Sequence, residues 1–202
     1  YKGAALYRFK DLQSGQEIAV SQSFLVQTWE VETVVEPDKI QKPASLPPLY
    51  QAALAADELV PAKAPEIQAL AKRIVQGERN PWRAARLIHE YLTRNLAWTD
   101  SKTALKPLEA LAAKTADSSS YAVIAAALLR AAGVPAQPVT GYLIDPSRRA
   151  ARHAWVEFYI YGLGWVPMDP ILASGARPGG FDAAFTDPGR YFGGMDNHRI
   201  SF

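Results

Sequence analysis

One helix that must be buried on all sides constrains this chain more than any other feature. The stretch SSYAVIAAALLRAA at residues 119–132 has no polar face before Arg130. A helix that is apolar all round lies inside a protein rather than on its surface. Gly133 and Pro135 follow it, and these residue types are typical of a helix end. We therefore expect the rest of the chain to fold around this segment.

The size and composition favour a single domain over residues 1–202. The chain has 202 residues, of which 49% are hydrophobic and 21% are charged. These values are typical of a globular domain with one sizeable core. Within it we expect residues 1–50 to supply a strand and a proline-rich connection. Residues 51–202 should supply helices followed by a sheet.

Charge and residue content argue against several kinds of function. The 22 basic and 20 acidic residues are scattered and give a net charge of +2, so we expect no nucleic-acid partner. The chain has no cysteine and only three histidines, so we expect no disulfide and no metal site. No apolar run reaches the length of a membrane-spanning helix, and no signal peptide is recognisable.

The N-terminal part is predicted to hold one strand. The alternation within FLVQTWEVETVVEP, residues 24–37, is that of a strand with one buried face. That face would be formed by Trp29, Val31, Thr33 and Val35. Residues 37–50 are rich in proline, which indicates an extended connection.

Two amphipathic helices should follow. The first is predicted over residues 65–76, with Pro65 in its first turn and Gly77 after its end. The second should begin after Asn80 as the N-cap, and its apolar face would be formed by Trp82, Ala85, Ile88 and Leu92. His89 lies on this helix, and we expect a surface or structural role for it rather than a catalytic one. A short helical turn is predicted over residues 108–113.

The C-terminal part is predicted to form an antiparallel sheet. Strands are expected at residues 136–144, 153–161 and 164–170, with a hairpin turn at residues 162–164. The tail at residues 193–202 is expected to add an edge strand. Helices followed by antiparallel strands define an α+β fold class.

Three polar residues are expected to meet at one end of the buried helix. Ser118 opens that helix, where free backbone N–H groups and the helix dipole favour an anion. His153 begins one strand of the hairpin and Asp169 closes the next, so the turn brings them close together. An aspartate beside a histidine fixes its tautomer and stabilises the imidazolium. This pattern is that of a nucleophile, Ser118, a base, His153, and an orienting acid, Asp169.

The same residues also have purely structural explanations. Serine and aspartate are common helix N-caps, so the serines at residues 118–120 need no chemistry to explain them. A histidine before Ala-Trp can be a packed strand end, and an aspartate before proline often starts a turn. Spacing alone leaves both interpretations open.

Three ordered motifs resemble the transglutaminase-like superfamily, a branch of the papain-like folds. They are ADSSSYAVIAAALLRAAGVPAQPVTGY at residues 116–142, HAWVE at 153–157 and GWVPMDPI at 164–171. The resemblance extends over about residues 24–202. It implies a papain-like α+β core in which N-terminal helices, one of them buried and carrying the nucleophile, pack on an antiparallel sheet. It also implies a Cys-His-Asp triad and no cofactor.

The chain departs from the family pattern at the nucleophile. The family's cysteine aligns with Ser118, whereas His153 and Asp169 match its histidine and aspartate. Four further departures are Ala116 for Gly, Ser120 for Asp or Asn, Gln137 for Arg and Ile171 for Thr. A serine hydroxyl is much harder to ionise than a thiol, whose reference pKa is about 8.5. The family's acyl transfer at an amide, as peptide hydrolysis or glutamine amide exchange, is therefore expected to fall by orders of magnitude.

Three explanations of Ser118 follow. The chain is a natural pseudoenzyme that keeps its groove to bind peptide or protein, which the several neighbouring departures favour. Alternatively, Ser118 was introduced deliberately in place of the cysteine of an active protease or acyltransferase. In the third explanation the chain is a working Ser-His-Asp hydrolase.

The resemblance also carries expectations about the surroundings of the site. Trp155, Trp165, Tyr142 and Tyr159 either line a groove or belong to the core. Bacterial members of the family are often exported or tethered to a membrane, so we expect a periplasmic or cell-surface domain. The oligomeric state is not defined by the sequence.

Overall fold

The computed structural model describes residues 6–21, 23, 25–40, 44–101 and 105–201. The helices are α1 (Pro48–Ala52), α2 (Pro65–Val75), α3 (Pro81–Asn95), α4 (Pro107–Ala113), α5 (Ser118–Ala131) and α6 (Pro170–Ala173). The strands are β1 (Val31–Glu32), β2 (Ala97–Trp98), β3 (Thr115–Ala116), β4 (Ala136–Ile144), β5 (Ala150–Ile160), β6 (Gly164–Met168), β7 (Gly194–Met195) and β8 (Arg199–Ser201). Short 3-10 turns lie at Pro37–Lys39, Pro178–Gly180 and Pro188–Tyr191.

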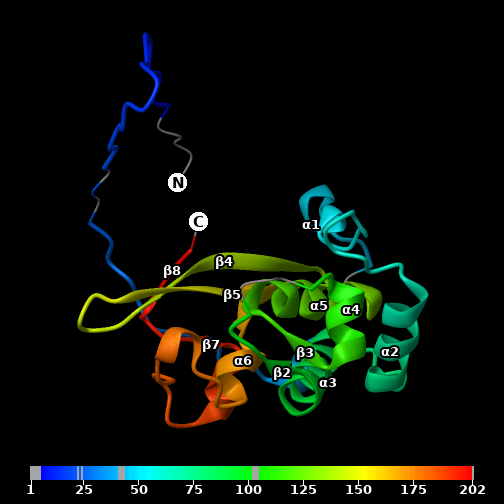
Figure 1. Cartoon of the computed structure of the whole chain (residues 1–202). Helices are drawn as coiled ribbons and strands as arrows, with labels where there is room; N and C mark the ends of the chain where they lie inside the picture. Colours follow the sequence, from blue (N-terminus) through cyan, green and yellow to red (C-terminus); the bar gives the residue numbers. More distant parts are fainter. Residues whose placement is uncertain (1–5, 22, 24, 41–43, 102–104, 202) are drawn as a thin grey trace.

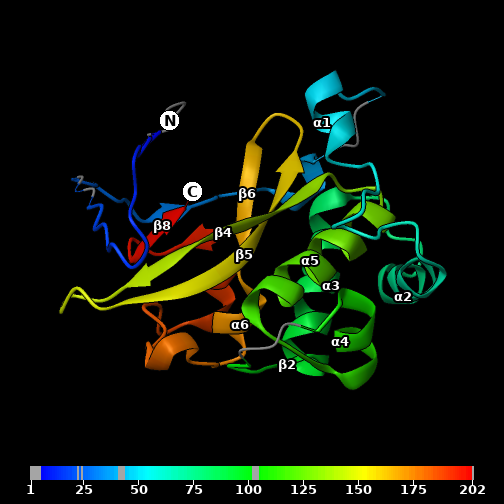
Figure 2. The same ribbon diagram turned by 45° about the horizontal axis from the view of Figure 1, so that its top comes forward.

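Four strands form one antiparallel sheet in the order β6-β5-β4-β8. β4 and β5 pair along their whole length, from Ala136 opposite Phe158 to Ile144 opposite Ala150. Their hairpin extends beyond the helices, and β8 lies beside β4 at the edge (Figures 1 and 2). The prediction of an α+β fold with helices packed on an antiparallel sheet is confirmed.

The buried helix is α5, and it forms the centre of the core. It packs on β4 and β5, while α2, α3 and α4 pack around the rest of it (Figure 2). The side chains of residues 124–129 are fully buried, as the apolar sequence predicts. Alanines at residues 125–127 let neighbouring backbones approach closely, so the position of this helix is set by packing on all sides.

Polar caps fix where the two central helices begin. The Asn80 side chain accepts hydrogen bonds from the backbone N–H groups of Trp82 and Arg83 at the start of α3. Asp117 does the same for Ser119 and Ser120 at the start of α5. Each cap satisfies backbone donors that the first helical turn leaves free. Helix α2 ends at Val75 because Gln76 adopts a left-handed conformation with φ of 49°.

The N-terminal strand is much shorter than predicted. Only Val31 and Glu32 are in a strand, β1, which pairs with the equally short β7. Trp29 is 69% exposed and Val31 is 39% exposed, so the predicted buried face is wrong for these two residues. The alternation failed here because it cannot show whether a long partner strand exists. Predictions for residues 24, 41–43 and 202 lie outside the described part of the chain.

Two strand ends differ from the prediction in a way that affects the site. β5 begins at Ala150, so His153 lies inside the strand rather than at its start. β6 ends at Met168, and Asp169 is the N-cap of α6 rather than the last residue of a strand. The cap holds the carboxylate in place through the backbone N–H groups of Ile171 and Leu172, each 3.1 Å from Oδ1.

Candidate active site

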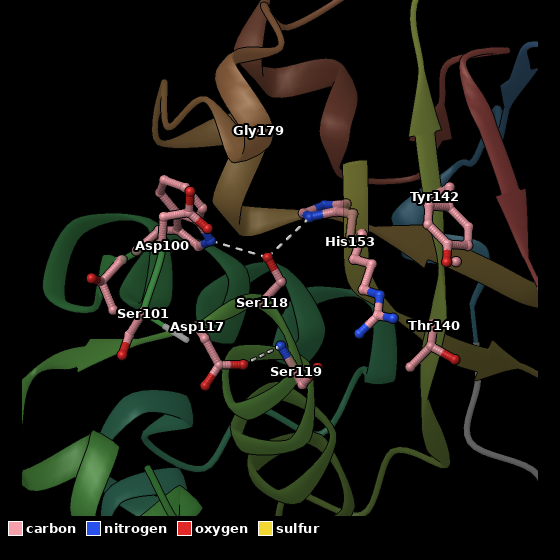
Figure 3. Close-up of a pocket in the computed structure, with 13 residues that line it drawn as sticks. Asp100, Ser101, Asp117, Ser118, Ser119, Thr140, Tyr142, His153 and Gly179 are labelled. Carbon is pink, nitrogen blue, oxygen red and sulfur yellow. Dashed lines mark hydrogen bonds between the residues drawn. The ribbon is translucent and has the colours of Figure 1, made fainter. Parts of the chain in front are cut away.

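Ser118 is the first residue of α5, directly after the N-cap Asp117. The backbone N–H groups of a first helical turn have no partner within the helix, and they carry the positive end of its dipole. Figure 3 shows the Ser118 side chain pointing from this helix end toward His153 on β5. The buried core helix therefore presents a hydroxyl to the sheet at its electropositive end.

The structure brings Ser118, His153 and Asp169 together in one hydrogen-bonded series. Ser118 Oγ lies 3.2 Å from His153 Nδ1, and His153 Nε2 lies 2.7 Å from Asp169 Oδ2. A carboxylate only accepts hydrogen bonds, so Nε2 carries the proton and donates it to Asp169. In the neutral imidazole Nδ1 is then an acceptor for the Ser118 hydroxyl. The series is thus oriented to carry a proton from Ser118 to His153.

Asp169 and His153 are almost completely buried, at 1% and 3% exposure. A cation reaches Asp169 from the C-terminal edge strand, because Arg199 Nη1 donates to Oδ2 over 2.7 Å. Burial by itself would raise the pKa of Asp169, but the charges of His153 and Arg199 outweigh it and hold that pKa well below its usual range. Asp169 is therefore an anion at neutral pH.

Arg199 is held by a second buried carboxylate. Its Nε and Nη2 atoms donate to Asp196 Oδ2 over 3.2 and 2.9 Å. Burial alone would lower the pKa of Arg199, and the charges of Asp169 and Asp196 raise it instead. The guanidinium also lies over the Trp155 ring, 5.3 Å from its centroid. Two carboxylates and one guanidinium thus form a charged cluster behind His153.

Trp98 supplies a hydrogen-bond donor on the other side of Ser118. Its indole Nε1 lies 3.0 Å from Ser118 Oγ and donates to it. β2, which carries Trp98, pairs in parallel with β3, immediately before the α5 cap. This pairing fixes the indole next to the start of the helix.

Trp98, Ser118 and His153 line a pocket of about 720 Å³. Its walls are formed by residues 98–101, residues 117–119, residues 140–142, Arg152, His153 and Gly179 (Figure 3). One wall belongs to β2 and the N-terminus of α5, and the opposite wall to β4 and β5. A substrate in this pocket would lie between the helical layer and the sheet.

The aromatic residues proposed for a groove separate into two groups. Tyr142 lines the pocket. Trp155 does not, because it is 2% exposed and lies within the core. Trp165 and Tyr159 also lie elsewhere, where Tyr159 stacks on Tyr50 with ring centroids 3.7 Å apart. Of the two alternatives, Trp155 thus belongs to the core. Trp165 lies outside this pocket, against the rings of Tyr50 and Tyr159.

His89 lies inside the protein and outside the pocket. It is 4% exposed, packs edge-on against Phe192 and leaves its Nε2 atom without a hydrogen-bond partner. Burial, together with the nearby charge of Arg86, lowers the pKa of His89 to about 4. The structural role expected for His89 agrees with this position, whereas a surface role does not.

Sequence reasoning missed Trp98, Arg199 and Asp196. The signal for Trp98 would have been an indole in the short segment that joins two helices. Arg199 and Asp196 belong to MDNHRISF, whose charged residues enter the interior only because β8 pairs with β4. Single-sequence patterns do not reveal such a distant pairing.

The residues that the structure describes contain neither a metal-binding cluster nor a membrane-spanning helix. No group of three or more histidine, aspartate or glutamate side chains there has an arrangement that could hold a metal ion. No helix in that part of the chain has both the length and the apolar character needed to cross a bilayer.

A buried helix with a nucleophile-type residue at its N-terminus, packed on an antiparallel sheet that carries a histidine and an adjacent aspartate, is the architecture of papain-like domains. Residues 68–170, about half of the 202 residues, match the sequence model of the transglutaminase-like superfamily. The chain belongs to the transglutaminase-like superfamily. A search of curated proteins gave no match.

Solved structures show the same fold. A candidate cysteine protease from Cytophaga hutchinsonii aligns with a TM-score of 0.58 and 18% identity, over 85% of this chain and 53% of that chain. The periplasmic domain of TgpA from Pseudomonas aeruginosa aligns with a TM-score of 0.50 and 25% identity, over 62% of this chain and 48% of that chain. The chain therefore spans about half of the length of the solved structures that it matches.

Proposed function

We propose that this chain is an amide-binding domain of the cysteine protease and acyltransferase type, with Ser118 at the nucleophile position and turnover strongly impaired by the oxygen. In this proposal Ser118 occupies the position of the nucleophile and His153 acts as the base. Asp169 orients the His153 imidazole. The ligand is a peptide or protein segment whose amide lies in the pocket between α5 and β5.

The observation that carries the proposal is the hydrogen-bonded series from Ser118 to Asp169. Its two contacts, 3.2 and 2.7 Å, are within the range in which a base takes a proton from a nucleophile and is itself oriented. The ring nitrogens are used in the opposite sense to the Ser-His-Asp triad of the chymotrypsin type, in which Nε2 faces the serine. A helix N-cap and a charged pair would have explained Ser118 and Asp169 separately, but not their common contact with one imidazole.

The reaction available to this geometry is acyl transfer. Ser118 Oγ would bond to the amide carbonyl carbon as its proton passes to His153 Nδ1. The C–N bond would then break as that proton passes to the leaving amine. Water or a second amine would release the acyl group. The Ser118 backbone N–H and the Trp98 indole N–H are the donors placed to stabilise the oxyanion.

Oxygen at this position accounts for the impairment. A thiol is partly ionised near neutral pH, whereas a serine hydroxyl needs proton removal during attack itself. The C–O bond is also shorter than C–S, so the attacking atom lies further from the carbonyl. A misplacement of about 1 Å lowers a rate about 100-fold.

A second candidate is a working Ser-His-Asp hydrolase. It is favoured by the same 3.2 Å contact, because a hydroxyl in hydrogen-bond range of a buried base is already placed for activation. The two candidates differ in rate, and one set of variants separates them.

The test compares the parent chain with Ser118→Cys, Ser118→Ala and Ser118→Cys/His153→Ala. Alkylation by iodoacetamide across pH gives the pKa of the introduced thiol. Peptide hydrolysis and incorporation of a fluorescent amine into a glutamine peptide give the activity. The double variant is the matched control, since it keeps the thiol and removes only the base.

We expect Ser118→Cys to titrate well below pH 8.5, to lose that shift without His153, and to exceed the parent's activity at least about 100-fold. Parent activity equal to that of Ser118→Cys and absent from Ser118→Ala would instead establish the hydrolase. A thiol of ordinary pKa that is indifferent to His153 would contradict both candidates.

An extracytoplasmic location is part of the proposal. It is supported by the likeness to the periplasmic domain of TgpA at 25% identity. Fractionation of cells that express the natural full-length protein, with periplasmic and cytoplasmic marker enzymes, tests it. Recovery with the cytoplasmic marker would contradict it.

A further inference from the structure

The pocket carries a cation beside the histidine that the proposed mechanism does not use. Arg152 precedes His153 on β5 and lines the same pocket as Ser118. His153 is buried, whereas Arg152 is exposed. Among the described residues that line this pocket, Arg152 is the only lysine or arginine.

Two nearby arginines, Arg149 and Arg199, are neutralised by carboxylates, but Arg152 is not. Arg149, on the same hairpin, pairs with Asp145 over 2.6 Å. Arg199, behind the site, pairs with Asp169 and Asp196. Within the described part of the chain, the guanidinium of Arg152 takes part in no hydrogen bond or ion pair. Its charge is therefore available to a ligand.

The opposite wall of the pocket holds two carboxylates, Asp117 and Asp100. Both oxygens of Asp117 already accept from the protein, Oδ1 from two backbone N–H groups and Oδ2 from Ser120 Oγ. Asp100 is exposed and lines the pocket. The sheet wall, with Arg152, thus attracts anions, and the wall near Asp100 does not. The N-terminus of α5 adds to the attraction at Ser118 itself.

We propose that Arg152 selects substrates that carry a carboxylate close to the reacting amide. This inference rests on the proposed function, because it names the substrate class of the same pocket. The carboxylate is either an acidic side chain next to the amide or the free C-terminus of a short peptide. Arginine binds carboxylates with two parallel N–H donors, which gives orientation as well as attraction.

The Ser118→Cys variant allows a test that needs no known substrate. Iodoacetate and iodoacetamide alkylate a thiolate by the same step, in which an S–C bond forms as the C–I bond breaks and iodide leaves. They differ only in carrying a carboxylate or a neutral amide. The ratio of their rates therefore reports how strongly the pocket attracts a carboxylate next to position 118.

We expect Arg152→Gln to lower the iodoacetate-to-iodoacetamide ratio at least about fivefold at low salt, with a smaller effect at high salt. Arg152→Lys should keep much of the ratio. Arg148→Gln is the matched control, because it removes the same charge from the turn at the tip of the β4–β5 hairpin. This tip extends away from the helices (Figure 2).

An unchanged ratio in Arg152→Gln, with both reagents still reacting, would overturn the inference and leave the proposed function standing. Failure of the thiol to react faster than a free thiol with either reagent would overturn the proposed function, and this inference with it.

Protection experiments distinguish the two sources of the carboxylate. Iodoacetamide alkylation is followed with three competitors: a capped peptide containing glutamate, the same peptide with glutamine, and an uncapped peptide with a free C-terminus. Protection by the first indicates an internal acidic side chain, and protection by the third a terminal carboxylate. Either effect should be lost in Arg152→Gln. Equal protection by the glutamine peptide, or protection by none, would overturn the inference.

Discussion

Arg199 and His153 donate to the same atom, Oδ2 of Asp169, each over 2.7 Å. The carboxylate that orients the histidine is therefore also the counter-ion of a buried arginine. The charges of His153 and Arg199 hold the pKa of Asp169 well below its usual range, so the shared oxygen belongs to an anion. The oxygen atom that His153 contacts at the start of α6 is therefore shared with a residue of β8.

Replacing Arg199 should destabilise the fold severely. Arg199→Leu leaves Asp169 and Asp196 buried without their cation, and breaking a buried ion pair lowers the free energy of unfolding by about 3–5 kcal/mol. Urea denaturation measures this. Arg177→Leu is the control, because Arg177 pairs with Asp182 at the surface and should change stability by no more than about 1 kcal/mol. Similar losses in the two variants would contradict the role given to Arg199.

The pH dependence of stability should contain a contribution from His89. Its folded pKa of about 4 lies below the reference value of 6.5, so the unfolded chain takes up the proton first as the pH falls. Stability from this group is complete above pH 6.5 and is lost toward pH 4. The loss between pH 7 and pH 5 should be about 2 kcal/mol.

His89→Leu should remove this contribution, because leucine fills the site without a titrating group. Free energies of unfolding at pH 7 and pH 5 are measured for both proteins by urea denaturation. The difference between the two pH values should be about 2 kcal/mol smaller in the variant. An equal pH dependence in the two proteins would contradict a lowered pKa of His89 in the folded state.

The Trp98 indole should influence a thiol at position 118. A donor to the charged form of a group lowers its pKa when that form is an anion. In the Ser118→Cys background, Trp98→Phe removes the donor and keeps an aromatic ring, so the thiol pKa should rise by about 0.5–1 unit. The alkylation rate against pH measures the shift. Tyr142→Phe, on the sheet wall of the same pocket, is the control and should leave the thiol pKa where it is.

Gly141 is required by the contact between β4 and β8. A Cβ atom at this position would lie 2.0 Å from the backbone oxygen of Ile200, so Gly141→Ala must displace the strand that carries Arg199. We expect a loss of about 1–3 kcal/mol in the free energy of unfolding. Gly189→Ala is the control, because its Cβ would meet only the movable Asp187 side chain, at 3.2 Å. If Gly141→Ala is tolerated as well as Gly189→Ala, the edge pairing is looser than described.

Local patterns predicted the parts of the fold that depend on local causes. The apolar run at residues 119–132 predicted that α5 is buried, and Asn80 with Pro81 predicted where α3 begins. The hairpin turn expected at residues 162–164 predicted that β5 pairs with β6. In each case the responsible residues are neighbours in sequence, so their spacing carries the information.

Features that depend on distant pairing were not predictable in the same way. Trp29 has the alternation of a buried strand residue but is 69% exposed, because β7 offers only two residues for pairing. Arg199 has a charge typical of surfaces but is 6% exposed, because β8 pairs with β4 and its side chain reaches Asp169. The meeting of Ser118 with His153 was expected from motif order. Its catalytic role stays a prediction.

The packing of α5 has a consequence for how this protein can change over generations. Ser118 stands at the tip of a helix whose residues 124–129 are sealed in the interior, so its place is fixed by side chains that never meet a substrate. Exchange of sulfur for oxygen at that tip leaves those side chains untouched. A substitution at position 118 can therefore change the chemistry of this site in a single step without changing the packing of α5 that positions it.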